Sequence, residues 1–295
     1  MKSEMAREKA SLLGRAWEAA ARNSSMSVWL WTSVLLFALI MAAPVYFVAR
    51  QDFGRSLSGS DLGRLGFLWL GDVIFKYQDL APAVAGWLLV PLALFILLSV
   101  FLNGGVIGRL VAGGGRTKFM DFMADCGRFF GRFLRAFLLA IPVYILVFGG
   151  LMKLVSTALD AWIEGAGGEL SVIIASNLRV LVALLLLSLV QMAFDYVKIH
   201  IVAAQEKSVF TAAARVAAFL RKRFFKAWIL YLVGTAAGAA TGALFLAVTS
   251  ILPGAGPAGF APGFLWAQAF IWSRIWIRIF INATEIQLYG RTMAS

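Results

Sequence analysis

Two sets of polar residues recur at helical spacing inside sequence that is otherwise apolar. The first comprises Arg274, Arg278, Asn282, Glu285 and Tyr289, which follow one another at intervals of three or four residues and therefore share one face of a helix. Ionisable side chains within a membrane span usually face the protein interior or a wet cavity, because hydrocarbon solvates charge poorly. This face predicts either a path for a substrate or ion, or an ion-pair network that fixes helix packing.

The second set comprises Ser188, Gln191, Asp195 and Lys198, which also share a helical face. An unpaired arginine near the centre of a span costs roughly 2.5–3.5 kcal/mol on insertion scales. We therefore predict that Asp195 pairs with Arg278 and brings the two segments into contact. The candidate intramembrane polar network consists of Asp195, Arg274, Arg278, Asn282, Glu285 and Gln191.

The chain offers little for catalysis or metal binding. It contains a single cysteine, Cys126, and a single histidine, His200, so an internal disulfide cannot form and a Cys/His metal site is not expected. The glycine-rich stretch 108–118 lacks the Gly-Lys-Ser/Thr ending of a phosphate-binding loop and is predicted to be a flexible joint. We expect no enzyme activity, no cofactor and no metal.

The segments that carry the polar sets are long enough to cross a bilayer. Hydrophobic residues make up 61% of the 295 residues and charged residues 14%, against about 25% charged residues in a soluble domain. Uncharged apolar runs of this kind predict an all-α polytopic membrane protein. We expect six transmembrane helices, at roughly 28–49, 82–108, 134–156, 174–197, 226–251 and 263–286.

Basic residues alternate with these predicted spans. The N-terminal segment and the segments after the second and fourth spans are rich in Lys and Arg, whereas 253–262 carries no charge. The positive-inside rule places the basic segments in the cytoplasm. We therefore expect a multi-pass protein of the bacterial inner membrane with both termini cytoplasmic. The net charge of +12 then reflects topology and anionic lipid, and no nucleic-acid partner is expected.

The segments 117–133 and 207–224 have the pattern of interfacial amphipathic helices. In the first, Phe122, Phe129 and Phe133 fall on one arc, opposite Asp121 and Asp125. We expect such aromatic arcs to enter the headgroup boundary while the charged faces point to water. The expected contacts with anionic lipid headgroups are Arg128, Arg132, Arg135, Arg221, Lys222, Arg223 and Lys226.

An internal repeat is predicted from these segments. RFLRAFLL at 132–139 aligns with RFFKAWIL at 223–230, and the N-terminal segment 1–27 is also amphipathic. We interpret the chain as three units, each an interfacial helix followed by a helical hairpin, although shared physics alone would produce a similar pattern. The first unit carries an extra external segment at 50–80. The domain division is 1–27, a single transmembrane domain at 28–288 and a cytoplasmic tail at 289–295.

Small residues mark the fifth span. Gly234, Gly238 and Gly242 recur every fourth residue, a spacing that lets helix backbones approach closely. The face they form is predicted to pack within the chain, with a homodimer interface as the alternative.

The amphipathic helix followed by the span entry RFFKAWILYLVG, together with the ending AQAFIWSRIWIRIFINATEIQLYGR, resembles a group of uncharacterised bacterial six-helix membrane proteins. That group includes the membrane domain that accompanies some glycerophosphodiester phosphodiesterases. The resemblance covers roughly residues 100–291 and lies in the overall pattern of aromatic, basic and apolar residues, without a set of invariant positions. It implies a six-helix membrane domain without catalytic residues, because the hydrolase chemistry of such proteins belongs to a separate soluble domain.

Three functions remain open at this point. The favoured one is a non-catalytic scaffold or regulatory subunit that binds anionic lipid through its basic interfacial helices, with a homo-oligomer or membrane complex as its setting. The alternatives are a transporter or permease that uses the two polar faces, and a lipid-handling protein that uses its cytoplasmic aromatic residues. A hydrated cavity that reaches Arg274 would favour transport, whereas a plugged, ion-paired bundle would favour the scaffold.

Overall fold

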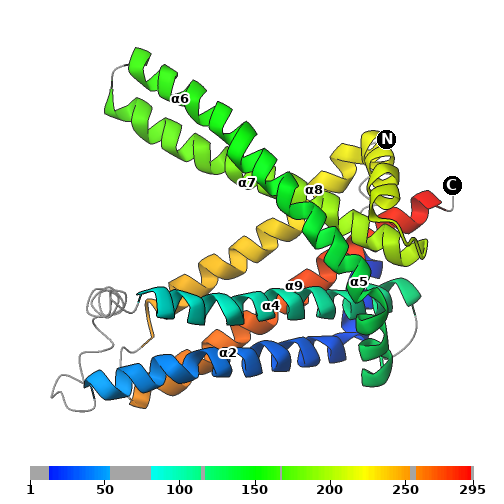
Figure 1. The fold of residues 1–295 in the computed structure, drawn as a ribbon, viewed down its shortest axis with the longest axis horizontal. Helices are drawn as coiled ribbons and strands as arrows, with labels where there is room; N and C mark the ends of the chain where they lie inside the picture. The colour runs from blue at the N-terminus through cyan, green and yellow to red at the C-terminus, as the bar shows by residue number, and fades with distance from the viewer. Residues whose placement is uncertain (1–12, 54–80, 114–116, 167, 253–256, 294–295) are drawn as a thin grey trace.

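The computed structural model describes residues 13–53, 81–113, 117–166, 168–252 and 257–293, and it is all-helical in these residues (Figure 1). The predictions for residues 1–12 and for 54–80 of the external segment lie outside the described residues. A short helix at 13–22 comes first. The elements that follow are α2 (Ser24–Phe53), α4 (Ala81–Ala112), α5 (Phe119–Tyr144), the π-helix η3 (Ile145–Leu151), α6 (Met152–Ala166), α7 (Glu169–Ala203), α8 (Val209–Thr249) and α9 (Pro257–Met293).

Six described helical segments are long and apolar enough to cross a membrane, as predicted. Their bounds differ from the expected spans because the helices continue past the apolar runs. The third segment joins α5, η3 and α6 into one helical stretch, Phe119–Ala166, so the predicted interfacial helix at 117–133 and the third span are continuous. Likewise, α9 continues through the predicted tail as far as Met293.

Two of the three predicted amphipathic helices end at a break before their span. The helix 13–22 ends in a turn at Asn23, and α8 bends at Arg223, whose backbone has φ −131° and ψ 21°. The Asn23 turn is fixed by a buried hydrogen bond in which Thr117 Oγ1 donates to Asn23 Oδ1 at 2.6 Å. This order of elements is compatible with three helix-plus-hairpin units, and common ancestry of the units stays a prediction.

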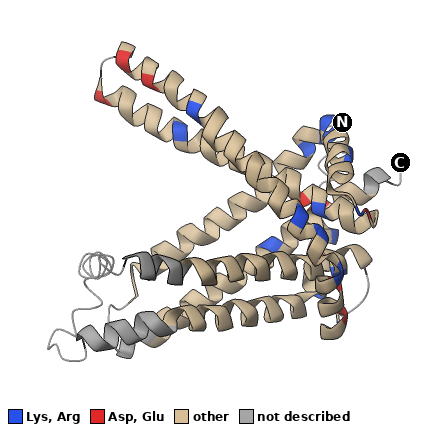
Figure 2. Ribbon diagram, in the orientation of Figure 1, with Lys and Arg blue, Asp and Glu red and all other residues tan. Residues whose placement is uncertain are grey.

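The core lies at the end of the molecule where α5 and α8 begin and α7 and α9 end, which we call the basic end. Most of the described Lys and Arg residues gather there, whereas Asp and Glu mark the tip of the α6–α7 hairpin (Figure 2). α9 lies centrally and contacts α2, α4, α7 and α8. Away from the basic end the α6–α7 hairpin diverges from the other helices (Figure 1), and no residue of α6 is buried.

The aromatic arc of α5 faces protein, and the prediction that it enters lipid is wrong. Phe122, Phe129 and Phe133 are buried in the core. Asp125, which was expected to face water, is buried as well and accepts from Arg109 Nε at 2.6 Å. An amphipathic pattern shows that a face needs an apolar partner, and here α4 and its neighbours supply that partner in place of lipid.

The contact between α4 and α5 depends on glycines that the sequence analysis did not single out. A Cβ atom on Gly105 would lie 2.5 Å from Cys126 Sγ and 2.7 Å from the Phe122 ring. A Cβ atom on Gly108 would lie 2.9 Å from Asp125 Cβ. Small residues on one helix face, such as Gly104 and Gly108 four residues apart, allow this close approach. Residue 108 therefore belongs to a packed interface, and the predicted flexible joint does not begin there.

We expect Gly105→Ala to lower the free energy of unfolding by roughly 1–3 kcal/mol, the cost of overpacking a filled interface. The matched control is Gly127→Ala on α5, where a Cβ atom would meet nothing within 4 Å and alanine favours the helix. Reversible unfolding in mixed micelles measures both variants. Equal stability of the two would contradict the close contact.

Candidate intramembrane anion site

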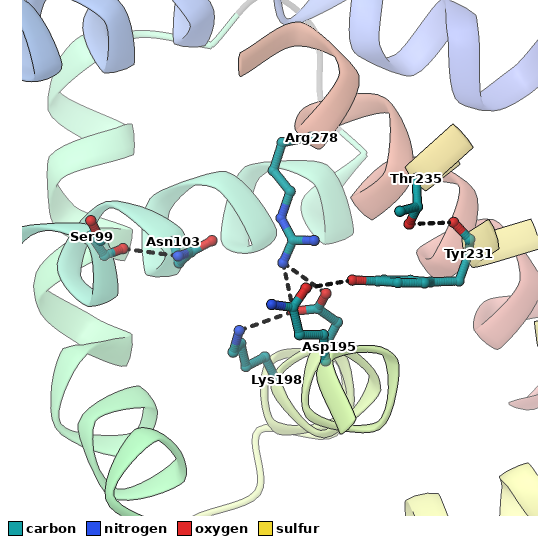
Figure 3. A network of polar contacts seen from close by, with 8 residues as sticks. Ser99, Asn103, Asp195, Lys198, Tyr231, Thr235 and Arg278 are labelled. Atoms are coloured by element: carbon teal, nitrogen blue, oxygen red, sulfur yellow. Dashed lines mark hydrogen bonds and ion pairs between the residues drawn. The ribbon is translucent and has the colours of Figure 1, made fainter. Parts of the chain in front are cut away.

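Asp195 is the centre of the polar network on α7. Both of its carboxylate oxygens accept from Arg278 Nη2, at 2.8 and 2.7 Å, and Lys198 Nζ donates to Oδ1 at 2.9 Å. Asp195 is only 2% exposed, so its charge is compensated by the two cations and hardly by solvent. The predicted pair between α7 and α9 is therefore present (Figure 3).

A ladder of polar contacts holds the same part of α7 against α8. Trp228 Nε1 donates to Ser188 Oγ at 3.1 Å, and Tyr231 Oη donates to Gln191 Oε1 at 2.9 Å. Each contact joins residues 40 positions apart in the sequence. Gln191 thus belongs to the network as predicted, but through Tyr231, which the sequence analysis did not single out.

Arg274 lies one helical turn before Arg278 on α9 and has a different environment. Its side chain is exposed, and its Nη1 donates to the Gly238 carbonyl oxygen at 3.3 Å. Among the described residues no carboxylate contacts it. Gly238 leaves room for this contact, since a Cβ atom there would lie 3.3 Å from Arg274 Nη1.

The other two predicted packing glycines, Gly234 and Gly242, differ in their surroundings. A Cβ atom on Gly234 would overlap the Ile281 side chain, whereas one on Gly242 would meet nothing within 4 Å. The first two glycines therefore pack α8 against α9 within the chain, and Gly242 takes no part in that contact. The homodimer alternative is not needed to explain Gly234 and Gly238.

A pocket of about 330 Å³ opens beside the two arginines. Its apolar walls come from α2 and α4, with Leu30, Val34 and Phe95 among them, and its polar end comes from α9. The complete lining is Leu30, Val34, Phe95, Leu98, Ser99, Leu102, Asn103, Val106, Arg274, Ile275, Arg278, Ile279 and Asn282. The two predicted alternatives for the polar faces are therefore both present. The faces pair with one another through Asp195 and Arg278, and the α9 face also lines a pocket.

Two buried polar side chains without partners continue the α9 face from the pocket. Asn282 and Glu285 are each 1% exposed, and neither side chain has a hydrogen-bond partner among the described residues. Glu285 therefore does not pair with Arg278. Tyr289 ends the face and lies 2.5 Å from His200 Nδ1 through its hydroxyl. Native proteins leave few buried polar groups unsatisfied, so Asn282, which lines the pocket, marks a place for a polar ligand.

Asn103 and Ser99 on α4 were missed as site residues. The Asn103 amide donates to the Ser99 carbonyl oxygen at 2.9 Å, and Figure 3 shows Asn103 across from the Arg278 side chain. Both side chains are uncharged and stand alone among the apolar residues of the second span, so the sequence pattern did not mark them as site residues. Only the packing of α4 against α9 brings them to the arginines.

The residues proposed to contact lipid headgroups lie on α5 and α8 near the basic end. Arg128 Nη2 donates to Gln205 Oε1 at 2.9 Å, whereas Arg135 Nε donates to the Gly131 carbonyl oxygen of its own helix at 3.0 Å. Arg221, Lys222 and Arg223 are exposed and Lys226 is partly exposed, and headgroup contact by these residues stays a prediction.

Comparisons of this chain with models of protein families, with curated proteins and with solved structures gave no match. The functional argument therefore depends on the site itself.

Proposed function

We propose that this protein is a lipid-handling membrane protein that binds an anionic amphiphile in the pocket beside Arg274. The observation that carries the proposal is an exposed arginine in an apolar span that no described carboxylate contacts. Such a charge needs an anion or water next to it, because hydrocarbon solvates it at a cost of several kcal/mol.

The rest of the pocket favours an amphiphile over a small ion. A phosphate or carboxylate group would satisfy Arg274, and the Asn282 amide can donate to the same headgroup. The walls from α2 and α4 are apolar apart from Ser99 and Asn103, so a small inorganic ion would leave most of the pocket without a partner. An acyl chain fills such walls and gains about 0.8 kcal/mol for each buried methylene group.

The charge distribution supports an orientation with the basic end in the cytoplasm. Asp160, Glu164 and Glu169 lie at the far end of the α6–α7 hairpin, whereas Arg109, Arg128 and Arg215 belong to the basic end. The positive-inside rule then gives the orientation. No catalytic or metal-binding role is proposed. The residues that line the pocket act by binding the headgroup and the acyl chain of the amphiphile.

We expect Arg274→Gln to weaken binding of phosphatidylglycerol about tenfold or more, because a hydrogen bond to a charged group contributes about 1.5–3 kcal/mol. Val34→Phe should also weaken binding, by filling the pocket without changing charge. The measurement is retention of added phosphatidylglycerol over phosphatidylcholine in native mass spectra of the full chain.

The control for this experiment is Arg135→Gln, which removes the same charge from a side chain bonded to its own helix. Equal loss of retention in Arg274→Gln and Arg135→Gln, with none in Val34→Phe, would point to general surface charge. Unchanged retention in Arg274→Gln and Val34→Phe would refute the pocket as the site. Uptake of a water-soluble anion by proteoliposomes, abolished by Arg274→Gln, would favour a permease in place of a lipid-handling protein.

A further inference from the structure

A second anion site is indicated on α5, outside the membrane pocket. Arg128 and Arg132 lie four residues apart and both approach the same buried ring: their Cζ atoms are 5.4 and 5.7 Å from the centroid of Phe129. Like charges at this helical spacing repel each other. Among the described residues neither arginine contacts a carboxylate.

The acids that could have neutralised this pair are engaged elsewhere. Asp125, one turn before Arg128, is bound by Arg109, and Asp121 lies 3.8 Å from the same arginine. Glu206, beside Gln205 in the connection between α7 and α8, pairs with Arg215 at 3.1 Å. The two guanidinium groups therefore keep their full charge without a counter-ion from the protein.

One of the two arginines is held in place by a strained residue. Gln205 has φ 50°, a left-handed backbone conformation that is uncommon for residues with a side chain. Its Oε1 accepts from Arg128 Nη2 at 2.9 Å, while its Nε2 donates to the Val202 carbonyl oxygen at 2.8 Å. The turn thus holds the Arg128 guanidinium group through a neutral partner. Gln205 orients this group but does not neutralise its positive charge.

Arg132, near the same ring, has an unmet donor. Its Nη1 is buried and has no hydrogen-bond acceptor among the described residues. Paired guanidinium groups with unused donors are the usual receptor for a phosphate group, because the planar fork matches the spacing of its oxygens.

We propose that Arg128 and Arg132, with Gln205 as the positioning residue, bind a phosphate group, and that the phosphate belongs to a lipid headgroup. The site lies on the charged face of α5 at the basic end, and α5 continues directly into the third span. A phosphomonoester lipid such as phosphatidate fits best, because its charge of up to two matches two arginines. This site is independent of the pocket beside Arg274.

The test uses the full chain in a neutral detergent, titrated separately with short-chain phosphatidate, with the matching phosphatidylcholine and with inorganic phosphate. We expect tight binding of phosphatidate alone, weakened at least about tenfold in Arg128→Gln/Arg132→Gln and less strongly in Gln205→Ala. The control, Lys118→Gln/Lys207→Gln, removes the same net charge from two exposed lysines at the same end and should bind like the unaltered protein.

Equal losses in the two double variants would overturn the site, because general electrostatic attraction would then explain the binding. Unchanged binding in Arg128→Gln/Arg132→Gln would overturn it as well. Inorganic phosphate that binds as tightly as phosphatidate would overturn the lipid source and assign the site to a free phosphate group. Arg274→Gln should leave the phosphatidate titration unchanged, which separates this site from the pocket; monodisperse elution of every variant in gel filtration establishes that each one is folded.

Discussion

Replacing Asp195 by asparagine should lower the free energy of unfolding by about 1.5–3 kcal/mol, because it removes the charged acceptor of the hydrogen bonds from Arg278 and Lys198. Asp195 is 2% exposed and holds both Arg278 and Lys198, whose side chains are only partly exposed, so solvent can replace it only in part. The residue also joins α7 to α9, and its loss should loosen the α6–α7 hairpin from the rest of the protein. Reversible unfolding in mixed micelles gives the measurement.

The double variant Asp195→Asn/Arg278→Gln should recover part of that loss. Removing both members of the pair leaves Lys198 as the one cation that has lost its carboxylate, and it should cost less than removing Asp195 alone. Arg215→Gln breaks the more exposed Glu206–Arg215 pair and serves as control, with an expected change of at most about 1 kcal/mol. A double variant less stable than Asp195→Asn would show that the two residues do not act as a pair.

Replacing Phe122 by alanine should cost about 3–5 kcal/mol, the usual range for removing a buried phenylalanine. Phe122 is fully buried between α4 and Trp29, whose ring lies 5.2 Å away. Phe119, one turn earlier, is 49% exposed, so Phe119→Ala should cost much less. The two single variants are compared by the same unfolding measurement.

The comparison distinguishes the two partners that an apolar helix face can have. A spin label at position 119 should report lipid or water, and a label at 122 should report a tightly packed protein interior. If Phe119→Ala proves the more damaging change, or if a label at 122 is mobile in lipid, then α5 lies on the membrane surface and the core described here is incorrect.

The spans and the central ion pair were predictable from the sequence for a simple physical reason. Hydrocarbon requires about twenty apolar residues for each crossing, and it makes every charge within a span conspicuous. Asp195 was the acid on the fourth span and Arg278 lay on the sixth, so few pairings were open. The structure places the two residues within 2.8 Å.

The surroundings of α5 were not predictable in the same way. Periodicity indicates that Phe122 and Phe129 need an apolar partner, but protein and lipid satisfy that need equally. The decisive signal was the glycines of α4, since Gly104 and Gly108 have the spacing that was recognised only on the fifth span. The pocket was hidden for a related reason: its walls come from α2 and α4, and its arginines from α9. No local pattern links these segments.

The most direct test of the account is an experimental density map of the protein in nanodiscs formed from its native membrane. We predict elongated density between Leu30 and Phe95 on one side and α9 on the other, with a rounded end within hydrogen-bond distance of the Arg274 guanidinium group. Density of this shape that disappears in Arg274→Gln would establish the pocket as a lipid site. A pocket that holds only water, or that is closed by the protein's own side chains, would contradict the proposed function.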